Sequence, residues 1–362
     1  MSKFLSAQEI ARQALPILKD NLVFPMLSYV EYSDDFARRG DTVQIRKPPV
    51  YKASEFTGEI VKQDAAEEAV LVTLDKIADV SIEIGPREMA LQVEDFNTQV
   101  LEPAMAAIAE KINSDGMELY RDIPYVYGTA GSTPDDLSVF AGAAKMLNRQ
   151  KAPVSPRYGV WDYEALSKLQ VIPAVVNAEK SGDTQCLRDG SIGRILGMEN
   201  FMSQAVKNHA SGKLTSAKVK AEVPAGTGEI VLTAAEGDAV KRGDLLTVSG
   251  VTYTVTADAQ ADGTDLAAAV YPPVPEKIEA NAPAALTADH TANLAFHKNA
   301  FAFVTRPLEA AKGAESYVVN YEGITLRVTM DYDIATKKQI LSVDTLYGFK
   351  TIYPELACRI LG

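Results

Sequence analysis

An all-β stretch in the middle of the chain, Asp238 to Pro273, constrains its fold most strongly. The stretch is DAVKRGDLLTVSGVTYTVTADAQADGTDLAAAVYPP. Short runs rich in valine and tyrosine indicate strands, and the pair Asp262-Gly263 is typical of a tight hairpin turn. Helical patterns dominate much of the preceding sequence. We therefore expect residues 213–292 to form a compact β module inserted in the chain.

The same stretch contains Arg242-Gly243-Asp244, a tripeptide known from integrin adhesion. Gly243 and Asp244 also suit a turn that leads into the strand LLTVSG. A match of three residues recurs by chance, and the first twenty residues lack the unbroken apolar centre of a secretory signal. We therefore interpret the tripeptide as a hairpin turn of the β module.

Composition and charge exclude several classes of protein. The 362 residues are enough for two or three domains, and 47% hydrophobic with 23% charged residues is an ordinary soluble composition. No run approaches the roughly 18 apolar residues of a membrane helix. The formal net charge of −12 disfavours tight binding to a phosphate backbone, which needs clustered lysine and arginine, but it is compatible with enclosing nucleic acid.

No pattern in the sequence indicates catalysis, a cofactor or a metal. The three histidines, His209, His290 and His297, have no ligand partner at a zinc-like spacing. No nucleophile elbow, Walker loop or strand-linked dinucleotide motif is present. Cys186 and Cys358 lie far apart in sequence, and we expect two reduced thiols, although the sequence alone leaves a disulfide open.

The N-terminal part of the chain contains elongated elements. Residues 1–40 resemble an arm, with one helical stripe that Pro16 is expected to interrupt and Pro25 to end. Residues 41–85 alternate as a long hairpin whose connection is too long for a tight turn. Residues 91–122 contain the longest helical pattern, in which Pro103 either starts the main helix or kinks it. Elements of this kind need a neighbouring chain to complete their packing.

Further segments have clear local signals. RYGVWDYEALSKLQ predicts a strand followed by a helix with Asp162 at its N-cap, and residues 189–206 predict a turn and a half-buried strand. Strands are also expected in LAFHKNAFAFVTRPL, YVVNYEGITLRVTMDYD and QILSVDTLYGFKTIYPELACRIL.

Taken in order, these pieces resemble the major capsid proteins of tailed bacteriophages, with the Hong Kong ninety-seven fold. More narrowly they resemble the coat protein of the short-tailed Salmonella phage type, which adds an inserted β domain. The resemblance lies in CLRDGSIGRILGMENFMSQAV, VKRGDLLTVSGVTYTV, DGTDLAAAVYPPV, NLAFHKNAFAFVTRPL and LYGFKTIYPELACRILG, from Cys186 to the end of the chain. The last of these is similar to a terminal strand pair of the peripheral domain.

The resemblance implies an α+β capsid fold with five parts. They are an N-terminal arm (1–40), an extended loop (41–90), a peripheral domain with the spine helix (91–130 and 318–362), an axial domain (131–212 and 293–317), and the inserted β domain (213–292). The insert is shorter than expected for a full barrel, so some strands are expected to be absent.

The resemblance also implies a function and partners. The expected function is self-assembly into hexamers and pentamers of an icosahedral head that encloses double-stranded DNA through weak, non-specific contacts. A separate scaffolding protein and a portal are expected partners, with no membrane and no cofactor, and assembly in the host cytoplasm. The alternatives are an encapsulin-like cargo shell and a surface protein that binds a ligand through its β insert.

Contacts between subunits are expected at the tip of the extended loop, where aromatic and charged side chains alternate. The residues are Arg46, Lys47, Tyr51, Lys52, Glu55, Phe56 and Glu59. The alternative is an exposed flexible loop. Arg242, Gly243, Asp244, Asp262 and Gly263 are expected to form hairpin turns of the insert.

Overall fold

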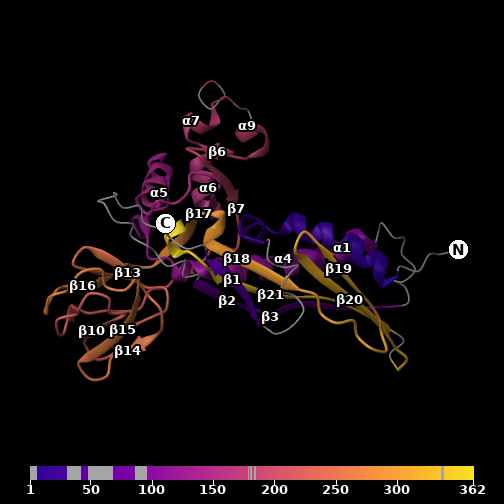
Figure 1. The fold of residues 1–362 in the computed structure, drawn as a ribbon. Coiled ribbons are helices and arrows are strands. Elements are labelled where there is room, and N and C mark those ends of the chain that lie inside the picture. The colour runs from indigo at the N-terminus through magenta and orange to yellow at the C-terminus, as the bar shows by residue number, and fades with distance from the viewer. Residues whose placement is uncertain are drawn as a thin grey trace, which may run out of the picture. The chain divides into compact units, whose positions relative to one another are not determined.

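The computed structural model describes most of the chain, which divides into two compact units (Figure 1). The described residues are 6–30, 42–47, 68–85, 96–177, 179, 182, 185–335 and 338–362. The first unit comprises Met1–Asn21, Tyr29–Ala109 and Ala302–Ile352, and the second comprises Leu22–Ser28, Glu110–Phe301 and Tyr353–Gly362. Each unit is therefore assembled from segments that lie far apart in the sequence.

The first unit is built on a five-stranded sheet in which the pairs β19–β20, β20–β21 and β21–β3 are antiparallel. The order is β18-β21-β20-β19, and β3 pairs with the other side of β21. Its elements are α1 (Ala7–Asn21), β1 (Thr42–Lys47), β2 (Glu68–Thr73), β3 (Lys76–Ile84), β18 (Phe301–Arg306), β19 (Glu315–Tyr321), β20 (Ile324–Asp333) and β21 (Lys338–Thr351). Alternation along β20 places Leu326, Val328 and Met330 on the buried face.

Helix α1 covers that buried face and contacts β19 and β20. A capping box starts the helix: the Glu9 amide donates to Ser6 Oγ at 3.3 Å, and the Ser6 amide donates to Glu9 Oε2 at 3.2 Å. Ile10, Ala14 and Leu18 form its buried stripe. The expected break at Pro16 is wrong, because the helix continues through this residue to Asn21.

The extended hairpin forms in part. β1 and β2 pair antiparallel with Val43 opposite Val72, as the alternation predicts. The rest of the expected return strand belongs elsewhere, because β3 pairs with β21, with Val80 opposite Val343. The tertiary partner of β3 is more than 250 residues away in sequence, and a local pattern does not identify it.

The long helix is continuous but changes its winding. A π-helical turn (Asn97–Leu101) leads into α4 (Glu102–Met117), and a 3₁₀ turn (Glu118–Asp122) follows. Pro103 follows the π-helical turn directly, so the N–H that proline lacks falls where the winding of the helix changes. The apolar stripe through Met105, Ile108 and Ile112 is buried, as the periodicity predicts.

The second unit contains a seven-stranded mixed sheet in the order β4-β22-β17-β5-β7-β6, with β8 paired to β17. The strands are β4 (Val126–Gly128), β5 (Arg157–Trp161), β6 (Arg194–Ile195), β7 (Met198–Met202), β8 (Asn208–His209), β17 (His290–His297) and β22 (Ala357–Leu361). The helices are α2 (Phe24–Leu27), α5 (Ser138–Arg149), α6 (Tyr163–Gln170), α7 (Pro173–Val176) and α9 (Gln185–Asp189), with 3₁₀ turns at Lys298–Ala300 and Pro354–Leu356.

One local prediction in this unit, the N-cap at Asp162, is confirmed, and another, the helix end at Pro25, is wrong. Asp162 caps α6 by accepting the amides of Glu164 at 3.1 Å and Ala165 at 3.2 Å. Pro25 does not end a helix but lies in the first turn of α2. Trp161 is fully buried in β5, and its indole N–H donates to Asn200 at 2.9 Å. The core around Trp161 includes Phe140 of α5 and Leu169 of α6.

The two last strands do not form the expected pair. β21 belongs to the sheet of the first unit, whereas β22 pairs with β17 and runs parallel to β4. The 3₁₀ turn at Pro354–Leu356 lies between them. The chain therefore changes sheet at this turn, and the apolar pattern of the two strands does not indicate the change.

The β module in the centre of the chain is a closed barrel. Six strands follow the order β16-β12-β13-β15-β10-β9, and Lys218 bridges to Pro283 to join β9 to β16. The Ala284 amide donates to Ala217 O at 3.0 Å and the Val219 amide to Ala282 O at 2.9 Å. The expectation that strands would be missing is therefore wrong, because the six strands present are enough to close the barrel. Closure also satisfies the backbone groups at the edges of this short module.

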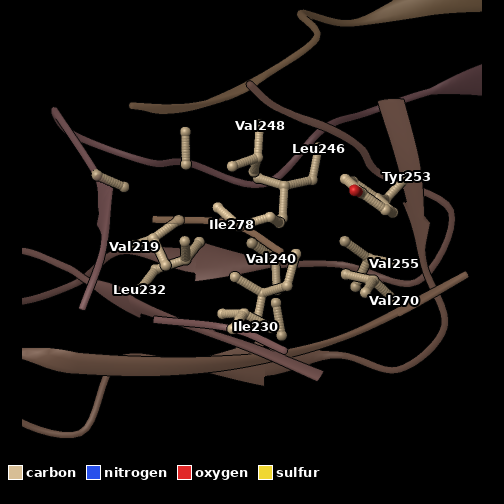
Figure 2. Close-up of a cluster of buried hydrophobic side chains, with 14 of the residues drawn as sticks. Val219, Ile230, Leu232, Val240, Leu246, Val248, Tyr253, Val255, Val270 and Ile278 are labelled. Carbon is tan, nitrogen blue, oxygen red and sulfur yellow. The ribbon is translucent and has the colours of Figure 1, made fainter. Parts of the chain in front are cut away.

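The barrel has its own hydrophobic core, in which valine, leucine and isoleucine side chains from its strands and loops point toward one another (Figure 2). Its strands are β9 (Lys218–Val219), β10 (Glu229–Thr233), β12 (Leu245–Val248), β13 (Val251–Val255), β15 (Asp265–Tyr271) and β16 (Ala284–Leu286), with the outlying pair β11 (Ala239–Val240) and β14 (Ala259–Gln260). Both cysteines, Cys186 and Cys358, are free thiols.

Candidate functional site

The expected contact residues of the extended loop lie at the margin of the described chain. Arg46 and Lys47 end strand β1, where the backbone is described but their side chains are not. Tyr51, Lys52, Glu55, Phe56 and Glu59 lie outside the described residues. A role for this tip in subunit contacts therefore stays a prediction.

The tripeptide Arg242-Gly243-Asp244 forms the turn that enters β12. Asp244 is fully buried and accepts the Lys241 amide at 2.7 Å and the Gly212 amide at 3.1 Å. Gly243 has a φ of +93°, and a Cβ there would lie 2.6 Å from Arg121 Cγ. The carboxylate therefore has a structural role and is inaccessible to an external receptor.

A chain of buried polar side chains continues from Asp244. His209 Nε2 lies 2.7 Å from Asp244 Oδ1, and His209 Nδ1 lies 2.8 Å from the Tyr120 hydroxyl. Asp244 directly precedes β12 of the barrel, His209 lies in β8, and Tyr120 lies in the 3₁₀ turn after α4. Hydrogen bonds between buried groups of this kind fix one relative arrangement of the elements that supply them.

Arg359 of β22 is the centre of this buried polar network. Its guanidinium donates to Gly243 O at 2.8 Å, to Tyr120 O at 2.7 Å and to Ile123 O at 3.1 Å. The guanidinium carbon lies 5.0 Å from the centre of the Tyr120 ring. Complete burial lowers the pKa of Arg359 to about 10, which leaves it charged at neutral pH.

His290, the first residue of β17, faces this guanidinium. His290 Nδ1 lies 2.8 Å from Ala288 O, so it is the protonated nitrogen and Nε2 points toward Arg359 Nη1 at 3.5 Å. Burial, together with the positive charge of Arg359, lowers the pKa of His290 to about 4. A neutral imidazole therefore accepts from a cation at this position.

Further contacts fasten the barrel to the rest of the second unit. Arg242 Nη2 lies 3.0 Å from Asp122 Oδ1, and the Thr254 hydroxyl donates to Arg121 O at 2.7 Å. At the far end of β15, the Tyr271 hydroxyl donates to Glu355 at 2.9 Å. Burial and the nearby Glu355 carboxylate raise the pKa of Tyr271. Tyr271 lies opposite Thr254 on the neighbouring strand, so these contacts fasten the same end of the barrel.

Asp262 and Gly263 lie in a turn, although the turn is shifted by one residue from the expected one. Asp262 and Asp265 form the closing bridge, and Gly263 and Thr264 are the central residues. Gly263 has a φ of +65°, which suits the first central position of a two-residue hairpin.

Sequence reasoning missed the network around Arg359. The signal was present in ACRIL, where one arginine lies within a run of apolar residues of a strand. A buried arginine needs several acceptors, yet the acceptors here lie more than 100 residues away.

Within the described residues, no cluster of three or more His, Cys, Asp or Glu side chains could hold a metal ion. The helices in that same part of the chain include none that is long and apolar enough to cross a membrane.

A solved structure from Mycobacterium phage Che8 is similar to this chain, with a TM-score of 0.52 and 16% identity over 94% of this chain and 90% of that one. The chain has the fold of this phage structure. The expectation of a fold found in a phage structure is thereby confirmed, whereas the capsid role and the narrower likeness to the Salmonella phage type stay predictions.

Two further solved structures are similar at lower scores. The capsid structure of the cyanophage P-SCSP1u has a TM-score of 0.49 and 13% identity over 94% of this chain and 88% of its own. The capsid structure of Ralstonia phage GP4 has a TM-score of 0.48 and 9% identity over 91% and 85%. No family model matches this chain, and no curated protein matches its sequence.

Proposed function

We propose that this chain is a major capsid protein that self-assembles into an icosahedral phage head enclosing double-stranded DNA. The observation that carries the proposal is the shared fold with the Che8 phage structure over nearly the whole of both chains. A fold alone does not specify a function, so surface and packing must agree with this role.

Exposed apolar side chains support assembly with other chains. Val171 and Leu187 of the second unit are 72% and 73% exposed, and Ile334 at the β20–β21 connection is 82% exposed. Single exposed apolar residues are normal on a monomer. In a shell, however, many modest contacts repeated over many copies hold the assembly together, and dispersed apolar contacts suit that requirement.

In this proposal, residues 1–40 are the N-terminal arm, 41–90 the extended loop, 91–130 with 318–362 the peripheral domain, 131–212 with 293–317 the axial domain, and 213–292 the inserted domain. The barrel strands lie within the last range, and its tight fastening through Arg359 and Asp244 suits a stabilising role on the exterior of the shell. The loop tip, with Tyr51 and Phe56, contacts a neighbouring subunit.

A separate scaffolding protein and a portal are the proposed partners, and packaged DNA is held only weakly. The net charge of −12 supports this part, because a basic inner wall would bind DNA and resist its movement. Strong, salt-sensitive binding of the purified subunit to duplex DNA would contradict it.

The alternative of a ligand-binding protein acting through the β module receives no support from its adhesion tripeptide. The Asp244 carboxylate is fully buried and already accepts hydrogen bonds from two backbone amides and from His209. An encapsulin-like cargo shell would share the fold and differ in its contents.

Electron microscopy of the chain expressed alone and together with its candidate scaffolding protein tests the proposal. Closed icosahedral shells are expected in at least one sample, and nucleic acid in particles from infected cells distinguishes a phage head from a cargo shell. Monomers or small discrete oligomers in both samples would refute the proposal.

A further inference from the structure

Strand β19 forms one edge of the five-stranded sheet of the first unit. It is Glu315–Tyr321, with the sequence ESYVVNY, and it pairs in unbroken register with β20. An edge strand of this length offers a row of backbone donors and acceptors to any other strand. Folded proteins usually protect such edges with charges, proline or a bulge.

β19 has none of these protections along most of its length. Glu315 at its first position is its only charged residue, and the regular register with β20 excludes a bulge. At the opposite edge of the same sheet, β3 has Lys76, Asp79 and Glu83 within nine residues. One edge is thus protected by charge, and the other is suited to pairing.

The hairpin geometry shows which groups point outward. Glu322 and Gly323 form a two-residue turn with φ of 50° and 79°, so the flanking Tyr321 and Ile324 are a hydrogen-bonded pair. The backbone groups of Val319 and Tyr317 therefore also form their hydrogen bonds with β20. The backbone groups of Ser316 and Val318 point toward the other side of β19, with which no strand of the described chain pairs.

We propose that β19 pairs antiparallel with β19 of a second copy of this chain, about a twofold axis at Val318, to form a continuous sheet across two subunits. The inference goes beyond the proposed shell function but rests on it for the presence of a neighbouring copy. Twofold contacts are isologous, so the same strand must be complementary to itself.

The sequence of β19 meets this requirement. About Val318, Tyr317 lies opposite Val319 of the second copy, and Val319 lies opposite its Tyr317. Aromatic and β-branched side chains form favourable cross-strand pairs. Glu315 lies opposite the second copy's Tyr321, so no two like charges meet.

The position of α1 is compatible with this pairing. The helix packs over both β19 and β20, so its axis lies roughly between them. With strands about 4.8 Å apart, the axes of two α1 helices across the twofold would be about 10 Å apart. That is within the upper range of helix packing distances, about 8–10 Å. The helices would pack rather than collide.

Disulfide trapping tests the proposal directly. In a Cys186→Ser background, Val318→Cys places two thiols at Cα positions about 5.5 Å apart across the axis, which suits a disulfide. Mild oxidation of the assembled protein should give a dimer of the 39.0 kDa chain on a non-reducing gel. The matched control is Tyr321→Cys, whose two copies would be about 20 Å apart and should give none.

A second variant tests the backbone bonds. Val318→Pro removes an outward N–H that β20 does not use, so the subunit should still fold, and pairing at this edge should be lost. Val318→Thr retains the donor and the branched side chain, and should behave as the unaltered chain. Equal assembly of the proline and threonine variants would overturn the proposal.

Electron microscopy of the same samples separates this inference from the proposed function. Closed shells in which Val318→Cys gives no dimer would overturn the pairing and leave the shell function intact. Dimers formed by Val318→Cys without any shells would support the pairing and count against the shell function.

Discussion

Replacement of Arg359 by methionine should strongly destabilise the second unit. Methionine fills a similar volume but donates no hydrogen bond, so the carbonyl groups of Gly243, Tyr120 and Ile123 lose their guanidinium donor. An unsatisfied buried acceptor costs roughly 1–3 kcal/mol. The variant also leaves the buried Asp244 carboxylate without its nearby cation.

Part of this cost is offset. Burial of the guanidinium is itself unfavourable, as its lowered pKa of about 10 indicates, and methionine removes that penalty. Tyr120 O also retains the Ile123 amide as a donor at 3.1 Å. We therefore expect a net loss of about 3 kcal/mol in the free energy of unfolding.

The only tryptophan of the chain, Trp161, provides the assay. It is fully buried in β5 of the same unit, so its fluorescence follows unfolding of the unassembled subunit in urea. The control is Arg149→Met in the last turn of α5, an exposed position with the same loss of charge. We expect a change below about 0.5 kcal/mol there. Equal effects of the two variants would refute the structural role of Arg359.

Three other predictions follow from the same structure. The lowered pKa of His290, about 4 against 6.5 in the unfolded chain, means that the unfolded state binds a proton more readily. Its contribution to stability, about 3 kcal/mol, should be present above pH 6.5 and lost as the pH falls toward 4. In the His290→Leu variant the urea midpoint should depend less on pH between 6.5 and 4. An unchanged pH dependence would contradict the role given to His290. Gly243→Ala should cost about 1–3 kcal/mol, because φ of +93° is unfavourable and the new methyl group meets Arg121. Thermal unfolding measures it, and an unaltered midpoint would show that the turn relaxes freely. Phe56→Ser should reduce the yield of shells in sedimentation without changing the urea midpoint of the unassembled subunit; normal shell yield would argue against a contact at the loop tip.

Local sequence signals predicted elements wherever neighbouring residues decide the outcome. The N-cap of α6 is an example, because Asp162 and the amides that it binds are separated by two or three residues. The hairpin of β1 and β2 and the buried stripe of α4 follow from alternation and helical period in the same way. The prediction at Pro16 failed because packing of α1 against the sheet outweighs the cost of proline in a helix.

The sequence by itself determined the α+β class, the position of the β module and the lack of any recognisable catalytic motif. Only the tertiary structure decided that the barrel closes, that β22 pairs with β17 and not with β21, and that Arg359 donates hydrogen bonds to Gly243 and Tyr120. The physical reason is the distance along the sequence over which each interaction acts. Propensity and periodicity act within a few residues, whereas a buried charge and a strand edge are satisfied by partners that only the folded chain brings together.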